Sequence, residues 1–162
     1  MMGDSSEPKV IMSTNGQEIL VDAEDFERCS RLWWHVIKRG YATRAIFENG
    51  RRFEVLMHRF ILGLDRHDGR IVDHANGNRL DNRKCNLRLC TKAQNGWNQG
   101  PQKTNTTGYK GVSRTPNDRF VAQIRCRGRK YHLGSFDTAE QAYEFYCLAA
   151  DLLHGEFANH GR

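Results

Sequence analysis

Four polar residues in the middle of the chain have the types and spacing needed to hydrolyse a phosphodiester bond. Asp73 and His74 are adjacent, and Asn86 and Asn95 follow them. Hydrolysis needs a base for water, a positive centre for the developing charge, and a group that orients the base. His74 suits the base, whereas the oxygens of Asp73 and Asn95 suit a hard ion such as Mg²⁺ or Mn²⁺. Asn86 is then suited to hold the imidazole by a hydrogen bond.

The segment that carries these residues must position them. Residues 71–74 have a strand pattern, a Gly- and Asn-rich loop follows, and a second strand and a short helix lead to Asn95. Taken singly, an Asp-His pair is more often a turn or surface pair, and Asn-Gly-Asn is first of all a turn signal. The functional interpretation therefore depends on the combination.

Short motifs in and around this segment closely resemble the HNH endonuclease family, of the phage and intron homing type. They are Met57-His-Arg-Phe-Ile-Leu-Gly63, Val72-Asp-His-Ala-Asn-Gly-Asn78, Leu80-Asp-Asn-Arg83, Asn86-Leu-Arg88 and Thr91-x-x-Gln-Asn-x-x-Asn98. This resemblance implies a ββα-metal (HNH, His-Me finger) nuclease fold with a single divalent ion. It places His74 as general base, Asp73 and Asn95 as metal ligands, and Asn86 as the residue that orients the histidine.

Other residues near the motif have two open interpretations. His58 and Arg59 recur in the family just ahead of the motif, where they either approach phosphate or pack within a helix. Five basic residues surround the motif loop, and some of them are expected to contact phosphate: Arg79, Arg83, Lys84, Arg88 and Lys92.

Cys85 and Cys90 lack two further zinc ligands, so we expect no structural zinc and two thiols that face the core. The three tryptophans, Trp33, Trp34 and Trp97, are predicted to be structural.

A second module is predicted near the C-terminus. Residues 119–127 alternate, with Phe120, Ala122, Ile124 and Cys126 on one face and basic or polar residues on the other. Flanking strands at 108–114 and 129–136 complete a meander. A capping box at Thr138 and apolar residues at helical spacing predict a helix that ends at Gly155. We expect a three-stranded antiparallel sheet packed on one helix, with a basic outer face.

The motifs of this module resemble the plant ethylene-response-factor type (APETALA-like) DNA-binding domain, which also occurs in phage endonucleases. They are Tyr109-Lys-Gly-Val112, Phe120-Val-Ala-Gln-Ile124, Leu133-Gly-Ser-Phe-Asp137, Glu140-Gln-Ala-Tyr143 and Gly155-Glu-Phe-Ala-Asn159. The resemblance implies DNA contacts from Lys110, Gln123 and Arg125 on the outer face of the sheet. Alternation and charge add Arg114, Arg119 and Arg127.

Length and charge agree with a small nucleic-acid-binding protein. The 162 residues allow one ordinary domain or two very small ones, and the formal net charge of +6 favours a polyanionic partner. The odd number of cysteines indicates a reducing compartment. The sequence has neither an apolar run of spanning length nor a signal peptide, so we expect a cytoplasmic location in a bacterial or phage-infected host cell.

These observations predict an α+β protein in four parts. They are an N-terminal α+β segment at 1–52, an HNH nuclease core at 53–100, a linker at 101–107 and the DNA-binding domain at 108–162. The predicted function is site-directed, metal-dependent cleavage of double-stranded DNA, by nicking or double-strand cutting, in a protein that we favour as a monomer. The alternative is a non-catalytic, sequence-specific DNA-binding regulator with a relic nuclease motif. An RNA-binding module is disfavoured because no exposed aromatic stacking platform is predicted.

Overall fold

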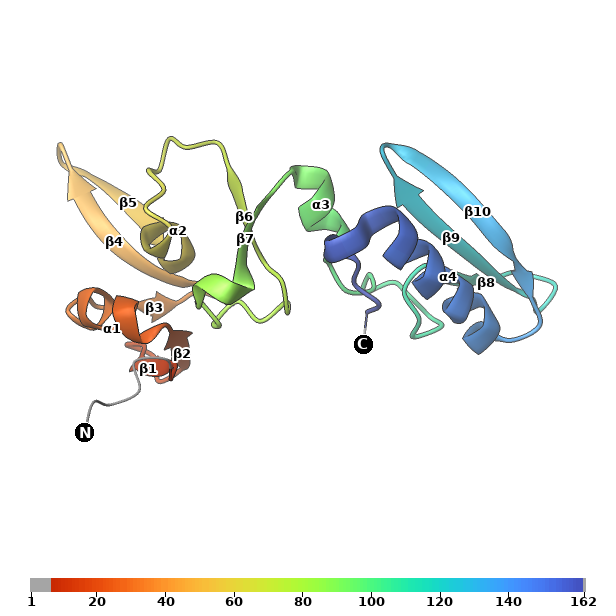
Figure 1. Cartoon of the computed structure of the whole chain (residues 1–162), viewed down its shortest axis with the longest axis horizontal. Helices are drawn as coiled ribbons and strands as arrows, with labels where there is room; N and C mark the ends of the chain where they lie inside the picture. Colours follow the sequence, from red (N-terminus) through yellow and green to blue (C-terminus); the bar gives the residue numbers. More distant parts are fainter. Residues whose placement is uncertain (1–6, 162) are drawn as a thin grey trace. The chain divides into compact units, whose positions relative to one another are not determined.

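The computed structural model describes residues 7–161, and the chain divides into two compact units between Cys90 and Thr91 (Figure 1). Each unit combines short helices with small antiparallel sheets, which confirms the predicted α+β class. Residues 91–100, which we assigned to the nuclease core, fall in the second unit. The predicted limits at 52, 100 and 107 remain predictions.

The first unit begins with a hairpin, a helix and a three-stranded sheet. The elements are β1 (Lys9–Met12), β2 (Glu18–Val21), α1 (Ala23–Ser30), β3 (His35–Val36), β4 (Ala42–Glu48) and β5 (Arg51–Leu56). Strands β3, β4 and β5 are neighbours in that order. Asn49 and Gly50 join β4 to β5 with φ angles of 50° and 74°, the positive values that an Asn-Gly hairpin turn requires.

A further hairpin in this unit, formed by β6 and β7, carries the first motif residues. Helix α2 (Met57–Ile61) leads to β6 (Ile71–His74), and a loop with one 3₁₀ turn (Lys84–Asn86) leads to β7 (Leu87–Cys90). The two strands are antiparallel, with Asp73 opposite Arg88 and His74 opposite Leu87. Asp73 and His74 therefore lie at the loop end of β6.

The core of the first unit surrounds Trp34, whose indole Nε1 donates a 3.0 Å hydrogen bond to the Cys29 carbonyl. Met57 and Val72 extend the same core to α2 and β6. Trp33 is 85% exposed, so the structural role that we predicted for it is wrong. Cys85 is also exposed, so it does not face the core as predicted.

The second unit contains the predicted meander and its covering helix (Figure 1). Its elements are α3 (Lys92–Trp97), β8 (Val112–Arg114), β9 (Phe120–Cys126), β10 (Arg129–Phe136), α4 (Ala139–His154) and a final 3₁₀ turn (Gly155–Phe157). The sheet order is β10-β9-β8. Ala122 and Ile124 pack with Ala142 and Tyr146 of α4, as the alternation predicted, whereas Val121 on the opposite face of β9 is also buried.

No helix within residues 7–161 is both long and apolar enough to cross a membrane.

Candidate active site

The Asp73–His74 pair is buried where β6 ends. The His74 imidazole contacts the His58 ring edge to face, with 5.1 Å between centroids, and the Tyr41 ring lies 6.0 Å away. Its Nε2 atom lies 3.5 Å from the amide oxygen Oδ1 of Asn82. Three neighbours from different elements therefore fix the orientation of this ring.

Burial keeps both histidines of this cluster uncharged. It lowers the pKa of His74, although the contacts with Asn82 and Asp73 act in the opposite direction. Burial, followed by the charges of His74 and Arg59, lowers the pKa of His58 to about 3. Both imidazoles are consequently neutral near pH 7, and a neutral imidazole is able to accept a proton from water.

The Asp73 carboxylate is held by the residue opposite it in the hairpin. Its Oδ2 accepts a 2.9 Å hydrogen bond from Arg88 Nε, and Arg88 Nη2 lies 2.8 Å from the same oxygen. The sequence placed Arg88 among the possible phosphate contacts. In the structure its guanidinium positions the carboxylate instead of lying on the outer surface.

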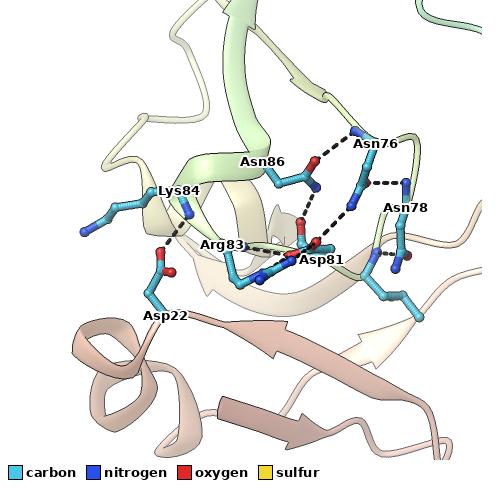
Figure 2. A network of polar contacts seen from close by, with 8 residues as sticks. Asp22, Asn76, Asn78, Asp81, Arg83, Lys84 and Asn86 are labelled. Carbon is cyan, nitrogen blue, oxygen red and sulfur yellow. Dashed lines mark hydrogen bonds and ion pairs between the residues drawn. The ribbon is translucent and has the colours of Figure 1, made fainter. Parts of the chain in front are cut away.

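Asn86 closes the loop that follows His74 (Figure 2). Its Oδ1 accepts a 2.9 Å hydrogen bond from the Asn76 backbone N–H, and its Nδ2 donates a 2.7 Å bond to the Asp81 carbonyl. Its own carbonyl accepts a 2.9 Å bond from the Ala75 N–H. Asn86 therefore fixes the backbone directly after His74. The side-chain amide oxygen that lies beside His74 Nε2 belongs to Asn82.

Asp81 is the centre of the same loop and is 1% exposed (Figure 2). It accepts two 2.7 Å hydrogen bonds from Arg83, through Nε and Nη2, and a 2.9 Å bond from Asn76 Nδ2. The Arg83 hydrogen bonds lower the pKa of Asp81 despite its burial. We did not single out Asp81 or Asn82 from the sequence, although both lie within the Leu80-Asp-Asn-Arg83 motif.

The N-terminal hairpin anchors this loop. The Leu20 N–H donates to the Leu80 carbonyl, and the Asn82 N–H donates to the Leu20 carbonyl, each at 2.8 Å. The Lys84 N–H donates to Asp22 Oδ2 at 2.7 Å (Figure 2). Residues 1–52 therefore contribute directly to the geometry of the loop after His74.

Several basic residues near the motif already have partners within the protein. Lys84 Nζ pairs with Glu24 at 2.5 Å and Asp25 at 3.3 Å, so its ammonium lies beside the acidic cluster of α1. Arg79 lies over the Tyr41 ring, 4.8 Å from its centroid, and donates to the Arg39 carbonyl. The sequence predicted a group of candidate phosphate contacts, but it did not reveal which cations are engaged in this way.

Arg59 also has an internal role. Its guanidinium donates to the carbonyls of Asp65, Asp68 and Arg70 at 2.7 to 2.8 Å and ties together the loop before β6. His58, its neighbour on α2, is buried against His74. Both residues therefore have partners within the protein, and phosphate contact by either of them stays a prediction.

Asn95 lies on α3 in the second unit. A complete capping box starts this helix, because the Thr91 hydroxyl accepts from the Gln94 N–H while Gln94 Oε1 accepts from the Thr91 N–H. The Asn95 N–H donates to the Thr91 carbonyl at 3.0 Å. Asn95 and Asp73 therefore belong to different units, and their role as metal ligands stays a prediction.

The predicted DNA-binding residues differ in their surroundings. Arg125 and Arg127 are exposed, and Gln123 is half-buried on β9. Arg114 pairs with Asp118 at 2.9 Å, and Arg119 pairs with Asp137 at 2.5 Å; all four of these side chains are largely exposed. Lys110 is different, because its Nζ donates to the carbonyls of Trp97 and Asn159, and burial lowers its pKa to about 8.

Comparison with known proteins gives matches to both parts of the chain. The family model for HNH endonucleases matches residues 66–97. An uncharacterized HNH endonuclease of Acanthamoeba polyphaga mimivirus is 32% identical over 148 residues, covering 88% of this chain and 74% of the relative. Protein 3.8 of Escherichia phage T7 is 33% identical over 91 residues, covering 56% of this chain and 74% of the phage protein.

The C-terminal region has relatives of another kind. An ethylene-responsive transcription factor of Arabidopsis thaliana is 51% identical over 57 residues, which are 34% of this chain and 22% of the plant protein. No solved structure matches the chain significantly. The mimivirus relative aligns with most of its own length, and the family model spans the hairpin of Asp73 and His74, so this chain belongs to the HNH endonuclease family.

Proposed function

We propose that this protein is a site-directed DNA endonuclease of the homing type, which hydrolyses a phosphodiester bond in double-stranded DNA. The observation that carries the proposal is the buried, oriented and neutral His74 beside Asp73, in a chain of the HNH endonuclease family. DNA as substrate or partner is further supported by the ethylene-responsive transcription factors among its relatives. Its setting is the cytoplasm of a bacterial or phage-infected cell, which the phage T7 relative supports.

His74 is the general base of this reaction. Its neutral imidazole takes a proton from the water that attacks phosphorus in line with the departing 3′ oxygen. The side chains of Asn82, His58 and Tyr41 hold the ring in place. Asn86 acts on the same ring indirectly, because it fixes the backbone of Ala75 and Asn76. The products are 5′-phosphate and 3′-hydroxyl ends.

Asp73 and Asn95 are the residues that would hold a divalent ion. One carboxylate and one amide oxygen form a hard donor set, which fits Mg²⁺ or Mn²⁺. The bound ion supplies positive charge that stabilises the pentacovalent phosphate and the leaving oxygen. Arg88 positions Asp73 through its ion pair, which keeps the carboxylate fixed on β6.

The C-terminal sheet locates the target. Exposed side chains on β8, β9 and the following turn include Arg114, Arg125 and Arg127, and a sheet of this size is able to enter the major groove. Arg119 and Gln123 complete the proposed contact surface. We favour a monomer that cuts one or both strands.

The test is nicking of a supercoiled plasmid that carries the sequence flanking the gene. Wild-type protein should nick it with Mg²⁺ or Mn²⁺ and stop when a chelator is added. His74→Ala should bind the same duplex with unchanged affinity and nick at least about a hundredfold more slowly, because it lacks the base. Tight duplex binding by the wild type without cutting under either ion would favour the regulator instead.

A further inference from the structure

Helix α3 has too little structure of its own to hold Asn95 in place. It has six residues, none of them buried. Isolated helices shorter than about 12 residues are marginal in water, so a helix this short depends on tertiary contacts. The contacts that determine its position should therefore be strong and specific.

An aromatic stack holds the C-terminal end of α3. The Trp97 ring is stacked on His154 with 4.4 Å between centroids and 6° between planes. His154 is itself buried at the end of α4, and its Nε2 lies 2.8 Å from the Arg125 carbonyl on β9. The stack thus joins α3 to the last residue of α4, the 16-residue helix of the C-terminal module.

Hydrogen bonds to the last carbonyls of α3 complete the attachment. Lys110 Nζ donates to the Trp97 carbonyl at 2.6 Å and to the Asn159 carbonyl at 3.0 Å. Asn159 Nδ2 donates to the Asn98 carbonyl at 2.7 Å. Carbonyls in the last turn of a helix lack partners within it and carry partial negative charge, so an ammonium at this position is favourable.

We propose that Trp97, Lys110, His154 and Asn159 form a latch that fixes α3 on the C-terminal module, with Lys110 as a positioning residue rather than a DNA contact. The family resemblance had implied a DNA contact for Lys110. An exposed lysine on a phosphate-binding face would leave its ammonium in solvent, whereas this ammonium is directed to two backbone carbonyls. The consequence for cleavage rests on the proposed function, because it acts through Asn95.

The latch can be tested separately from cleavage in the full-length protein. Lys110→Met keeps most of the aliphatic stem and removes the ammonium. Amide hydrogen exchange of Asn95 and Asn98, whose N–H groups donate to the carbonyls of Thr91 and Gln94, should become at least about tenfold faster. The slope of duplex affinity against salt should not change, and nicking at saturating DNA should slow.

Two further variants act as references. Asn159→Ala should accelerate exchange at the same amides, although it removes no charge. Arg125→Met, which alters an exposed cation of the sheet, should lower the salt slope by about 0.9 if its guanidinium neutralises one phosphate, and it should leave α3 exchange unchanged.

The opposite pattern would overturn the proposal. A lower salt slope with unchanged α3 exchange in Lys110→Met would make Lys110 a DNA contact. Faster exchange with an unchanged nicking rate would overturn the positioning role. If the wild type does not nick, the proposed function fails, while the exchange and salt-slope results still decide whether the latch exists.

Discussion

At the scale of single residues, two buried histidines in contact dominate the candidate site. His58 and His74 meet edge to face, and Tyr41 lies against both rings. Two charged imidazoles at this distance would repel each other in a poorly solvated site. Burial lowers the pKa of each, and the neighbouring His74 lowers that of His58 further, which suits a base that must be neutral near pH 7.

This arrangement predicts that the protein loses stability in acid through His58. The folded pKa of about 3 is below the ordinary value of 6.5, so the unfolded chain binds more protons between these pH values. The free energy of unfolding should therefore fall as pH decreases from about 6.5 towards 3. In His58→Phe, which keeps an aromatic ring against Tyr41, this fall should be smaller in urea titrations at a series of pH values.

His67 offers the matched control, because it is an exposed histidine a few residues away. His67→Asn should leave the pH dependence of stability as in the wild type. Equal slopes for His58→Phe and wild type would mean that His58 is not the group responsible.

At the scale of elements, the loop between β6 and β7 owes its shape to polar side chains that bond to its own backbone. Asn76 Oδ1 accepts from the Asn78 N–H, and Asn78 Oδ1 accepts from the Leu80 N–H, so consecutive Asx turns shape the chain (Figure 2). Asp81 and Asn86 then connect the two ends of the loop. The sequence correctly indicated a turn-rich loop, but its side-chain partners depend on the folded geometry.

Asp81→Asn should destabilise the first unit. It replaces a buried carboxylate that accepts two hydrogen bonds from Arg83, and the loss of such a charged contact costs about 2 kcal/mol. Asp118→Asn removes the same charge from an exposed pair with Arg114 and should cost less than about 1 kcal/mol. Urea unfolding followed by tryptophan fluorescence compares the two variants, and equal midpoints would contradict the central role of Asp81.

In the second unit, the backbone at Gly111 is closely packed against neighbouring residues. Its φ is 75°, and a Cβ atom there would lie 2.1 Å from Tyr146 Cδ2 and 2.9 Å from the Gln123 carbonyl oxygen. Gly111→Ala should therefore separate β8 from α4 and lower stability by more than about 2 kcal/mol.

Thermal unfolding of Gly111→Ala is best compared with that of Gly69→Ala. A Cβ atom at Gly69 would have no heavy atom within 4 Å beyond its two chain neighbours, and the φ of Gly69 is not positive, so its substitution should change the melting temperature little. A melting temperature for Gly111→Ala equal to that of wild type would show that the sheet and helix tolerate the added methyl group.

At the scale of the whole molecule, the proposed chemistry and the proposed target recognition belong to different elements. His74 and Asp73 lie on β6, whereas Arg114, Arg125 and Arg127 lie on or next to the C-terminal sheet. Variants at these two places should therefore affect different steps. A variant of the C-terminal sheet should bind duplex DNA more weakly but still cleave it at saturation. A variant of β6 should bind duplex DNA normally but fail to cleave it.

Arg127→Gln tests this division. Arg127 is an exposed cation in the turn between β9 and β10. Its replacement should weaken duplex affinity several-fold at low salt and leave the nicking rate at saturating DNA unchanged, because phosphate contacts contribute mainly to affinity. Fluorescence anisotropy and plasmid nicking measure the two quantities. A reduced rate at saturation with unchanged affinity would contradict the division.

The sequence by itself determined the features that depend on local order. The Asn-Gly turn at 49–50, the alternating strand at 120–126 and the capped helix at 139–154 follow from nearest-neighbour conformational preferences and from apolar periodicity. Residue types and intervals also identified Asp73, His74, Asn86 and Asn95 as candidates, and their roles remain proposals.

Only the tertiary structure decided which partner each polar side chain has. Nothing local in the sequence indicates that Arg88 pairs with Asp73, that Asp81 holds Arg83, or that Lys110 is directed to the end of α3. An arginine or lysine has the same local pattern whether it faces solvent, a carboxylate or a backbone carbonyl. Its partner is set by strand register and by contacts between distant segments, which exist only after the chain has folded.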